Sequence, residues 1–350
     1  MDIISYVYSE LRKFNRQIII DGSFGNADFD NVIGTYPRLV AFVDSYRIRK
    51  SFLTRQTIID VEYKNRSLDY NHVYEVYDDR SIDRALRLTL TRYDETMIIV
   101  ASDQNILRKM FNRETLTNVS TEFPYLKGAG TNRVVPLRFG GRSFVYVEAK
   151  LLYHVPVSKL KEQEEIVNKE VIRIAKMLFE PGMPKEVKAL LTHNYLCDLA
   201  TYDPNYLKST ITFNPDSHGA YGALISHVCV CHGYADAYRR ILNQGSVTCE
   251  TIRGVHKAGG ENHAWNLVRL DDGNYYHVDV TFDDQYKTIY NFFMKDDAFM
   301  RRDRSWNESE FPKASGMRNA LLIARSYIRL NRMKLLGRGI KPSILNADEY

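Results

Sequence analysis

The chain has 350 residues, of which 44% are apolar and 12% aromatic, enough to bury two moderate hydrophobic cores. Its 48 Lys and Arg residues against 43 Asp and Glu residues leave a formal net charge of +5, too small to indicate a nucleic-acid-binding protein. No apolar run is long enough to span a bilayer, and the acid at position 2 argues against an N-terminal secretory signal. We therefore expect a soluble, cytoplasmic protein.

Cysteine and histidine are concentrated in the second half of the chain. The cysteines are too few for a disulfide scaffold in a chain of this length and favour a reducing compartment; they are Cys197, Cys229, Cys231 and Cys249. Seven of the nine histidines fall between residues 193 and 277. Any reactive chemistry is therefore expected in this segment.

Residues 1–157 are interpreted as an N-terminal accessory domain of mixed α/β structure. Runs rich in β-branched and aromatic residues predict strands, with helical stretches between some of them; the runs cover residues 16–21, 56–63, 96–102, 133–139 and 143–155. Turn clusters such as Asp21-Gly22-Ser23 separate them. We find no repeat of fixed period and no chemical motif in this region, so we interpret it as a packing or substrate-docking domain.

The sequence pattern changes at residue 157. After Ser158, apolar residues recur at helical spacing and stop before Pro181, and Pro184 opens a second helix that ends near residue 203. This change predicts a domain boundary. We divide the chain into the accessory domain, a core over residues 158–310 and a basic helical extension over residues 311–350.

Cys231 is predicted to lie at the N-terminus of a helix. The apolar residues Val228 and Val230 lead into it, and helically spaced residues then continue until Gly245; they are Tyr234, Ala235, Tyr238, Ile241 and Leu242. The free N–H groups and partial positive charge of a helix N-terminus favour a thiolate, lowering a pKa that is about 8.5 in free cysteine. A lone cysteine is more often an inert buried side chain, so the neighbours of Cys231 decide between the two interpretations.

Two β-rich runs after Cys231 predict a hairpin that carries a histidine and a carboxylate. Residues 263–270 and 274–280 are separated by Asp271-Asp272-Gly273, a three-residue loop with glycine where a left-handed conformation is needed. Centring this loop on Asp272 makes Trp265 face Asp279. It also places His263 diagonally beside Asp279 on the same face of the hairpin. A two-residue turn would separate them onto opposite faces.

Cys231, His263 and Asp279 together supply a nucleophile, a base and an orienting carboxylate, in that chain order. The histidine would stabilise the thiolate as an ion pair and then protonate a leaving amine, while the aspartate would fix the histidine tautomer. Taken singly, each residue has a simpler structural interpretation. Their combination predicts a catalytic triad.

Three motifs around these residues resemble the core motifs of bacterial transglutaminase-like proteins. They are Val230-Cys231-His232-Gly233-Tyr234-Ala235, His263-Ala264-Trp265-Asn266-Leu267-Val268, and Tyr276-His277-Val278-Asp279-Val280-Thr281-Phe282-Asp283-Asp284. The resemblance covers about residues 160–300 and reaches the N-terminal half poorly or not at all. It implies a papain-like α+β core, in which the helix bearing the cysteine packs on an antiparallel sheet that carries the histidine and the aspartate.

The resemblance also implies a reaction. Proteins of this superfamily form a thioester on the cysteine; with water as acceptor they are peptidases or amidases, and with an amine they are transglutaminases. The catalytic residues carried over are Cys231, His263 and Asp279, and we expect a peptide or protein substrate with no metal or other cofactor. The backbone N–H of Cys231 is the expected oxyanion donor, with Tyr221 or His218 as a second donor and Trp265 at the rim of the site.

The sequence departs from the family pattern at two places. Phe282 stands where a tryptophan is common, and Ser226-His227-Val228-Cys229 replaces a smaller, glycine-containing approach to the nucleophile. Both lie at the rim of the expected site, so they put the choice of substrate in question more than the class of reaction.

Two other interpretations of the motif region remain open. A metal site is suggested by the closeness in sequence of His227, Cys229, Cys231, His232 and Cys249. However, Cys-x-Cys is not the usual spacing of a structural zinc site, and the absence of Cys-x-x-Cys pairs also argues against the zinc-containing deglycosylating branch of the superfamily. The second alternative is a non-catalytic binding or scaffold module of the same fold, which usually lacks a member of the triad.

The C-terminal extension is predicted to contain a basic amphipathic helix. Residues 311–347 include eight basic residues and no acid. One helical stripe carries Arg318, Arg325, Arg329 and Arg332, opposite an apolar face that includes Ala320, Leu321, Ala324 and Ile328. The stripe is interpreted either as a contact for an anionic surface or partner or, the favoured interpretation, as the solvated face of a helix docked on the core.

Overall fold

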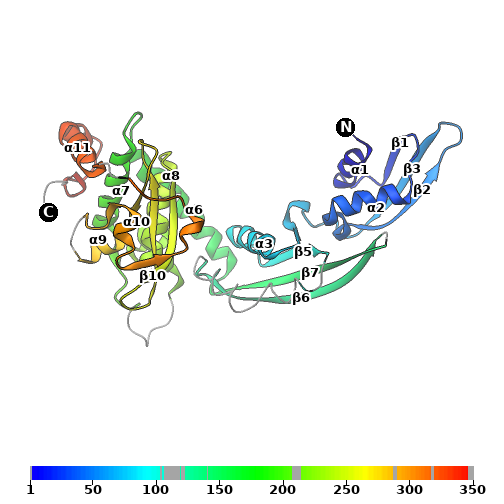
Figure 1. The fold of residues 1–350 in the computed structure, drawn as a ribbon, viewed down its shortest axis with the longest axis horizontal. Helices are drawn as coiled ribbons and strands as arrows, with labels where there is room; N and C mark the ends of the chain where they lie inside the picture. Colours follow the sequence, from blue (N-terminus) through cyan, green and yellow to red (C-terminus); the bar gives the residue numbers. More distant parts are fainter. Residues whose placement is uncertain are drawn as a thin grey trace. The chain divides into compact units, whose positions relative to one another are not determined.

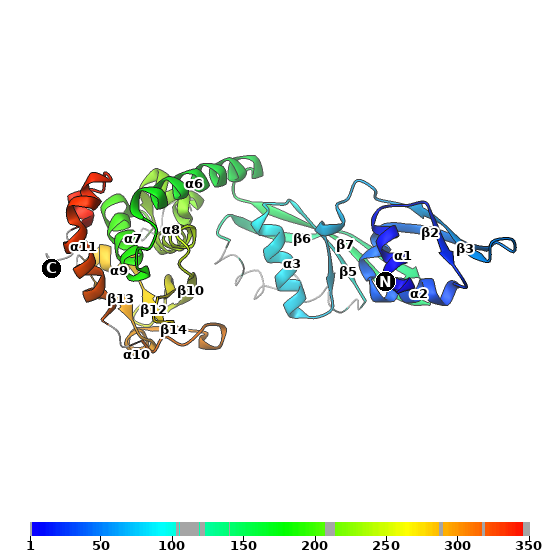
Figure 2. The same ribbon diagram turned by 90° about the horizontal axis from the view of Figure 1, so that it is seen from above.

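The chain forms two compact units, Met1–Val157 and Ser158–Tyr350, which are described separately (Figure 1, Figure 2). The structure is a computed structural model, and it describes residues 2–102, 105, 119, 123–139, 141–206, 214–286, 290–316 and 319–345.

Unit 1 is built on two sheets. The first is antiparallel with the order β1-β3-β2 and consists of β1 (Gln17–Asp21), β2 (Val43–Lys50) and β3 (Gln56–Tyr63). The second has the order β4-β5-β7-β6, is parallel only between its first two strands, and consists of β4 (Val73–Val76), β5 (Thr96–Ala101), β6 (Leu126–Phe139) and β7 (Arg142–Tyr153). All five predicted strands are confirmed. Two strands were not predicted: β2, an edge strand dominated by exposed polar residues, and β4, which has only four residues.

The helices of unit 1 cover both faces of the second sheet. They are α1 (Ile3–Arg12), α2 (Asn26–Thr35) and α3 (Asp79–Thr91), with short 3₁₀ turns at Pro37–Ala41 and Tyr70–His72. In β5, Ile98 and Val100 face the core that includes α1, α2 and the first sheet, whereas Met97 and Ile99 face the core that includes α3. This alternation follows from the two-residue period of a strand, so a nearly continuous apolar run is buried on both faces.

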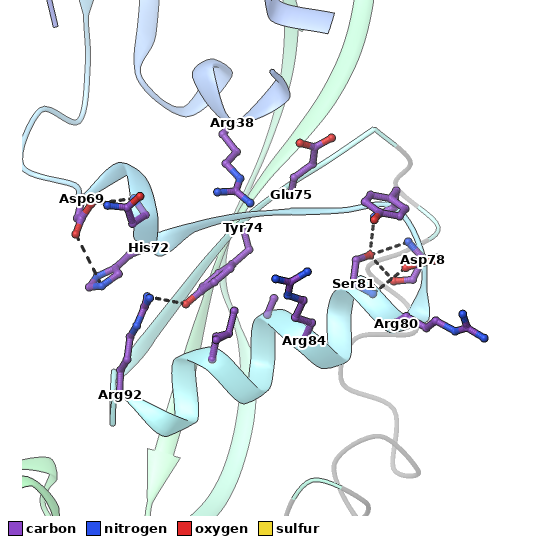
Figure 3. A pocket seen from close by; sticks show the side chains of 14 residues that line it. Arg38, Asp69, His72, Tyr74, Glu75, Asp78, Arg80, Ser81, Arg84 and Arg92 are labelled. Atoms are coloured by element: carbon purple, nitrogen blue, oxygen red, sulfur yellow. Dashed lines mark hydrogen bonds and ion pairs between the residues drawn. The ribbon is translucent and has the colours of Figure 1, made fainter. Parts of the chain in front are cut away.

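Unit 1 also contains a polar pocket of about 900 Å³ beside α3 and β4 (Figure 3). Its lining includes four arginines and three acids, which are Arg38, Arg80, Arg84, Arg92, Asp69, Glu75 and Asp78. Some of these charges are engaged locally. Asp78 caps α3 by accepting a hydrogen bond from the Ser81 backbone N–H (2.7 Å), and Arg92 donates to the Tyr74 hydroxyl (3.0 Å).

Unit 2 is built on an antiparallel five-stranded sheet with the order β13-β12-β11-β10-β14. Its strands are β10 (Cys249–His256), β11 (Asn262–Arg269), β12 (Tyr275–Val278), β13 (Phe293–Lys295) and β14 (Arg304–Trp306). A separate parallel pair joins β8 (Thr201–Tyr202) to β9 (Val228–Cys229). The three-residue loop of the central hairpin is confirmed, with Gly273 at φ +81°.

The helix α8 (Cys231–Gln244) of unit 2 packs on the central strands β10 and β11 of this sheet. The helices are α6 (Val157–Leu178), α7 (Lys185–Leu199), α8 (Cys231–Gln244), α9 (Val280–Tyr286), α10 (Asp297–Met300) and α11 (Ala320–Gly337). The amide of Asn266 on β11 donates to the carbonyl of Ala235 on α8 (2.9 Å), and Cys231, Ala235 and Ala264 are buried together. The helices predicted from Ser158, Pro184 and Cys231 are confirmed, as is the α+β class with the cysteine-bearing helix on an antiparallel sheet.

The basic C-terminal helix α11 belongs to unit 2 and buries its apolar face there. Arg325 lies over the Tyr290 ring at 5.1 Å, and Arg332 donates to the Leu345 carbonyl (3.0 Å). Two arginines of the predicted stripe are therefore engaged within the unit, and Arg318 lies outside the described residues. In the part of the chain that the structure describes, no helix is both long enough and apolar enough to cross a membrane.

Candidate active site

Cys231 is the first residue of α8. Val230 precedes it in an extended conformation (φ −100°, ψ −178°), so the cysteine lies where backbone N–H groups lack acceptors within the helix. Its side chain is close to fully buried, with 5% exposure. The predicted position at a helix N-terminus is confirmed, and the helix dipole there favours negative charge on the sulfur.

The hairpin register brings His263 and Asp279 together. Asn266 pairs with Val278 and Leu267 with His277, which is the register obtained by centring the loop on Asp272. Continuing it puts Asp279 opposite Trp265, just beyond the last paired residue of β12. His263 Nε2 then lies 2.7 Å from Asp279 Oδ2, which leaves Nδ1 as the ring nitrogen available to the sulfur.

Asp279 is fully buried and saturated with donors. Its Oδ2 accepts from His263 and from Arg304 (2.6 Å), and its Oδ1 accepts from the Phe282 backbone N–H (3.2 Å). Burial alone raises the pKa of this carboxyl, but the charges and hydrogen bonds of His263 and Arg304 outweigh burial and lower the pKa to about 2. Asp279 is therefore an anion at neutral pH.

The His263 ring packs against two aromatic side chains. Its ring stacks on Trp265 (centroids 5.8 Å apart) and meets the edge of Phe282 (4.8 Å). Burial lowers the pKa of His263, but the Asp279 carboxylate and the Cys231 sulfur outweigh it and raise the pKa to about 10. The phenylalanine that replaces the more common tryptophan thus still forms one wall of the site.

Cys231 differs electrostatically from the other cysteines. Burial raises the pKa of its thiol, but hydrogen bonds and charge from His232 and His263 outweigh burial and lower the pKa to about 5. Burial instead raises the pKa of the other three thiols, Cys197, Cys229 and Cys249. At neutral pH the site therefore holds a thiolate beside an imidazolium, while the remaining cysteines stay neutral.

His232 and Arg304 also belong to this site, although the sequence suggested only a metal-ligand role for His232 and none for Arg304. His232 follows the nucleophile on α8, and its Nε2 is shielded from solvent and has no hydrogen-bond partner among the residues that the structure describes. Arg304 on β14 is fully buried, donates to Asp279 and Asp303 (both 2.6 Å), and packs under Phe282 with its guanidinium carbon 4.2 Å from the ring centroid. Its sequence neighbours Arg301 and Arg302 are exposed, and nothing in the sequence distinguishes Arg304 from them.

Among the predicted rim residues, Trp265 lies at the site. Its indole N–H donates to His277 Nδ1 (3.0 Å), and His277 Nε2 in turn donates to Asp297 (2.8 Å). Burial lowers the pKa of His277, which suits the neutral tautomer that this chain of bonds requires. Because the polar hydrogen of its indole is bonded to His277, the Trp265 side chain is not free to donate to an oxyanion, and its ring stacks on His263.

Tyr221 and His218, the predicted second oxyanion donors, lie just before the nucleophile in the chain. His218 is buried, with Nδ1 3.0 Å from the Asn214 carbonyl and its ring against the edge of Tyr206 (5.4 Å). Tyr221 is half-buried against the main core of unit 2 at the start of the π turn Gly222–Ser226. The oxyanion role of either side chain stays a prediction.

The metal interpretation finds no cluster to support it. In the described ranges of the chain, no group of three or more His, Cys, Asp or Glu side chains has a geometry that could hold a metal ion. Cys229 and Cys249 are both buried as free thiols.

No protein-family model matches the chain, and no curated protein sequence matches it. Solved structures do match. A TGase has 13% sequence identity and a TM-score of 0.31, and the match covers 73% of this chain and 70% of the TGase. A candidate cysteine protease from Cytophaga hutchinsonii has 13% identity and a TM-score of 0.26, and the match covers 45% of this chain and 65% of that protein. The periplasmic domain of TgpA from Pseudomonas aeruginosa, bound to ethylmercury, has 14% identity and a TM-score of 0.27, and the match covers 46% of this chain and 67% of that domain. All three share 14% identity or less with this chain, so they indicate a similarity of fold and nothing about its activity.

Proposed function

We propose that this chain is a cysteine-nucleophile enzyme that opens amide bonds of peptides or proteins through a thioester acyl-enzyme. One observation carries the proposal. The Asp279 carboxylate holds His263 (2.7 Å) beside the sulfur of Cys231, at the N-terminus of a helix. This arrangement supports a nucleophile, a base and an orienting carboxylate supplied by α8, by β11 and by the residue that follows β12.

The first half-reaction follows from the thiolate–imidazolium pair. The Cys231 sulfur attacks the amide carbonyl carbon, and the electron pair of the C=O bond moves to oxygen to give a tetrahedral oxyanion. The Cys231 backbone N–H, which has no acceptor within the helix, is the proposed donor to that oxygen. His263 then gives its proton to the departing nitrogen, the C–N bond breaks, and a neutral imidazole and a thioester remain.

The second half-reaction restores the ion pair. His263 accepts a proton from water or from an incoming amine as that nucleophile attacks the thioester carbonyl, and the thiolate leaves. Water gives hydrolysis, and an amine gives transfer. Both outcomes use the same three residues and differ in how well water is excluded from the acyl-enzyme.

Arg304 supports this cycle as a positioning residue. It binds the same Asp279 oxygen as His263, which fixes the carboxylate and keeps it charged. The positive charge of Arg304 also repels the imidazolium of His263, because both groups bind the same Asp279 oxygen. Asp279 therefore stabilises the protonated His263, while the repulsion from Arg304 keeps the imidazolium able to release its proton.

A non-catalytic scaffold of the same fold is the competing proposal. The two are separated by incubating wild-type protein and Cys231→Ala with a mixture of glutamine- and lysine-containing peptides, with and without a labelled primary amine, and weighing the products by mass spectrometry. Label incorporation that depends on Cys231 identifies transfer, and shortened or deamidated peptides identify hydrolysis. A broad mixture that yields no product dependent on Cys231 would favour the scaffold.

A further inference from the structure

The turn between β2 and β3 of unit 1 exposes two adjacent apolar side chains. Phe52 and Leu53 are each 98% exposed, whereas the alternate residues Thr57, Ile59 and Val61 of β3 are buried. Single exposed apolar residues are common on protein surfaces. An adjacent pair with essentially no packing, at the tip of a hairpin, instead indicates a surface that something else covers.

The tip of the same hairpin is basic, although the strands that lead to it also carry Asp44, Asp60 and Glu62. Residues 45–59 contain four cations and no acid: Arg47, Arg49, Lys50 and Arg55. All four are exposed. Arg49 is paired with Asp60 on the neighbouring strand (2.6 and 2.9 Å), but the described residues include no ion pair for Lys50 or Arg55, the two cations that flank the tip.

The tip has a defined backbone. Pairing between the strands continues to Lys50 and Thr57, and the Ser51 N–H donates to the Gln56 carbonyl (2.9 Å). The Thr54 N–H donates to the Ser51 hydroxyl (3.3 Å), and Arg55 adopts a left-handed conformation at φ +56°. These bonds hold the turn in shape, so little order has to be gained when it meets a partner.

We propose that this hairpin tip docks on the surface of an anionic lipid bilayer. Phe52 and Leu53 enter the interfacial zone, where apolar side chains leave water, and Lys50 and Arg55 remain at the level of the charged headgroups. A protein partner fits less well, because stable protein interfaces bury at least about 1,200 Å² and the tip offers two side chains. A bilayer needs no complementary groove. The inference concerns unit 1 and does not depend on the proposed reaction.

The test is sedimentation of the full chain with vesicles of phosphatidylcholine alone or mixed with phosphatidylserine. The tip variant is Phe52→Ser/Leu53→Ser, and the charge variant is Lys50→Gln/Arg55→Gln. The matched control is Leu330→Ser/Met333→Ser, which removes two apolar side chains on α11 that are 85% and 80% exposed. All of these side chains are exposed, so the variants are expected to fold, and thermal unfolding verifies this.

Wild type and control should bind the mixed vesicles equally and bind neutral vesicles far more weakly. The tip variant should lose affinity about tenfold or more, and the charge variant should lose both affinity and most of the salt dependence. The proposal would be overturned if the wild-type protein bound neither type of vesicle, or if the tip variant bound as tightly as wild type. Absence of vesicle binding together with self-association that the tip variant abolishes would identify a second copy of the chain as the occupant instead.

Discussion

The described residues of unit 2 include three buried histidine–aspartate pairs, His263–Asp279, His193–Asp283 and His277–Asp297, and only the first of them faces a nucleophile. His263 and Asp279 lie 2.7 Å apart beside Cys231, whereas His193 and Asp283 lie 3.0 Å apart with both side chains fully inaccessible. The second pair is enclosed by the core. His193 Nδ1 contacts Asn194 (3.1 Å), and its ring packs on Tyr290 and Phe293.

The difference shows that a histidine bonded to a carboxylate does not by itself make a site. Asp283 Oδ1 accepts a hydrogen bond from the Phe292 N–H (2.9 Å), and Asp283 Oδ2 bonds to His193 on α7. The pair therefore connects the segment after β12 to the helix α7. The first pair instead directs its free ring nitrogen toward a sulfur at a helix N-terminus. The same interaction thus stabilises the fold in one place and is available for chemistry in the other.

The largest predicted effect is the loss of activity on removing the nucleophile. Cys231→Ala should reduce any peptide turnover by at least about ten-thousandfold without changing thermal stability much, because it deletes one sulfur and leaves the His263–Asp279 pair intact. Steady-state kinetics and a thermal melt measure the two quantities. Cys249→Ala removes another buried thiol and serves as the control, with activity retained.

The core pair should show the opposite pattern. His193→Ala leaves the buried Asp283 without its partner and should lower the free energy of unfolding by about 3–5 kcal/mol. Denaturant titration measures this loss. Alkylation of Cys231 in the protein that remains folded should proceed as in wild type. Loss of reactivity in a variant of undiminished stability would show that the two pairs do not divide the roles in this way.

Arg304→Gln should have an intermediate effect. Without this cation, Asp279 keeps His263 but loses a donor, and we expect turnover to fall about 10- to 100-fold. The sign of the pH effect follows from charge. Removing a positive neighbour raises the pKa of His263, so the alkaline limb of the pH–rate profile should move to higher pH. Arg302→Gln, on an exposed neighbour, should leave both turnover and pH profile unchanged.

Gly254→Ala should produce the smallest effect of the series. A Cβ at this position of β10 would meet the Ser305 carbonyl and the Trp265 ring, forcing β14 away from its neighbour. The cost is expected to be about 1–3 kcal/mol of unfolding free energy, with a modest loss of turnover through Arg304. Gly337→Ala, whose new Cβ would meet nothing within 4 Å, is the control.

The sequence predicted those parts of the site that depend on local pattern. Loop length determined the hairpin register, which brought His263 to Asp279, and helical spacing located Cys231 at the start of α8. The role of Arg304 could not be predicted, because this residue contacts Asp279 only when β14 pairs with β10. Sequence distance gives no indication of that pairing.

The core pair was missed for a related reason. Asp283 was seen only as part of a motif, and His193 lies 90 residues away on α7, so nothing local connects them. In unit 1, five strands were found from runs of β-branched and aromatic residues, whereas β2 was missed because most of its residues are exposed and polar, and β4 because it has only four residues. At the site, long-range packing, more than local propensity, separates what could be predicted from what could not.

Alkylation of Cys231 tests the central claim most directly. Wild-type protein is treated with iodoacetamide over a range of pH values, and the modified cysteine is mapped by mass spectrometry. The thiol loses its proton as pH rises through its pKa of about 5, so labelling at about pH 6 should be rapid and confined to Cys231. His263→Ala should largely abolish this selectivity. Slow, equal labelling of all four cysteines, or unchanged selectivity in His263→Ala, would contradict the account.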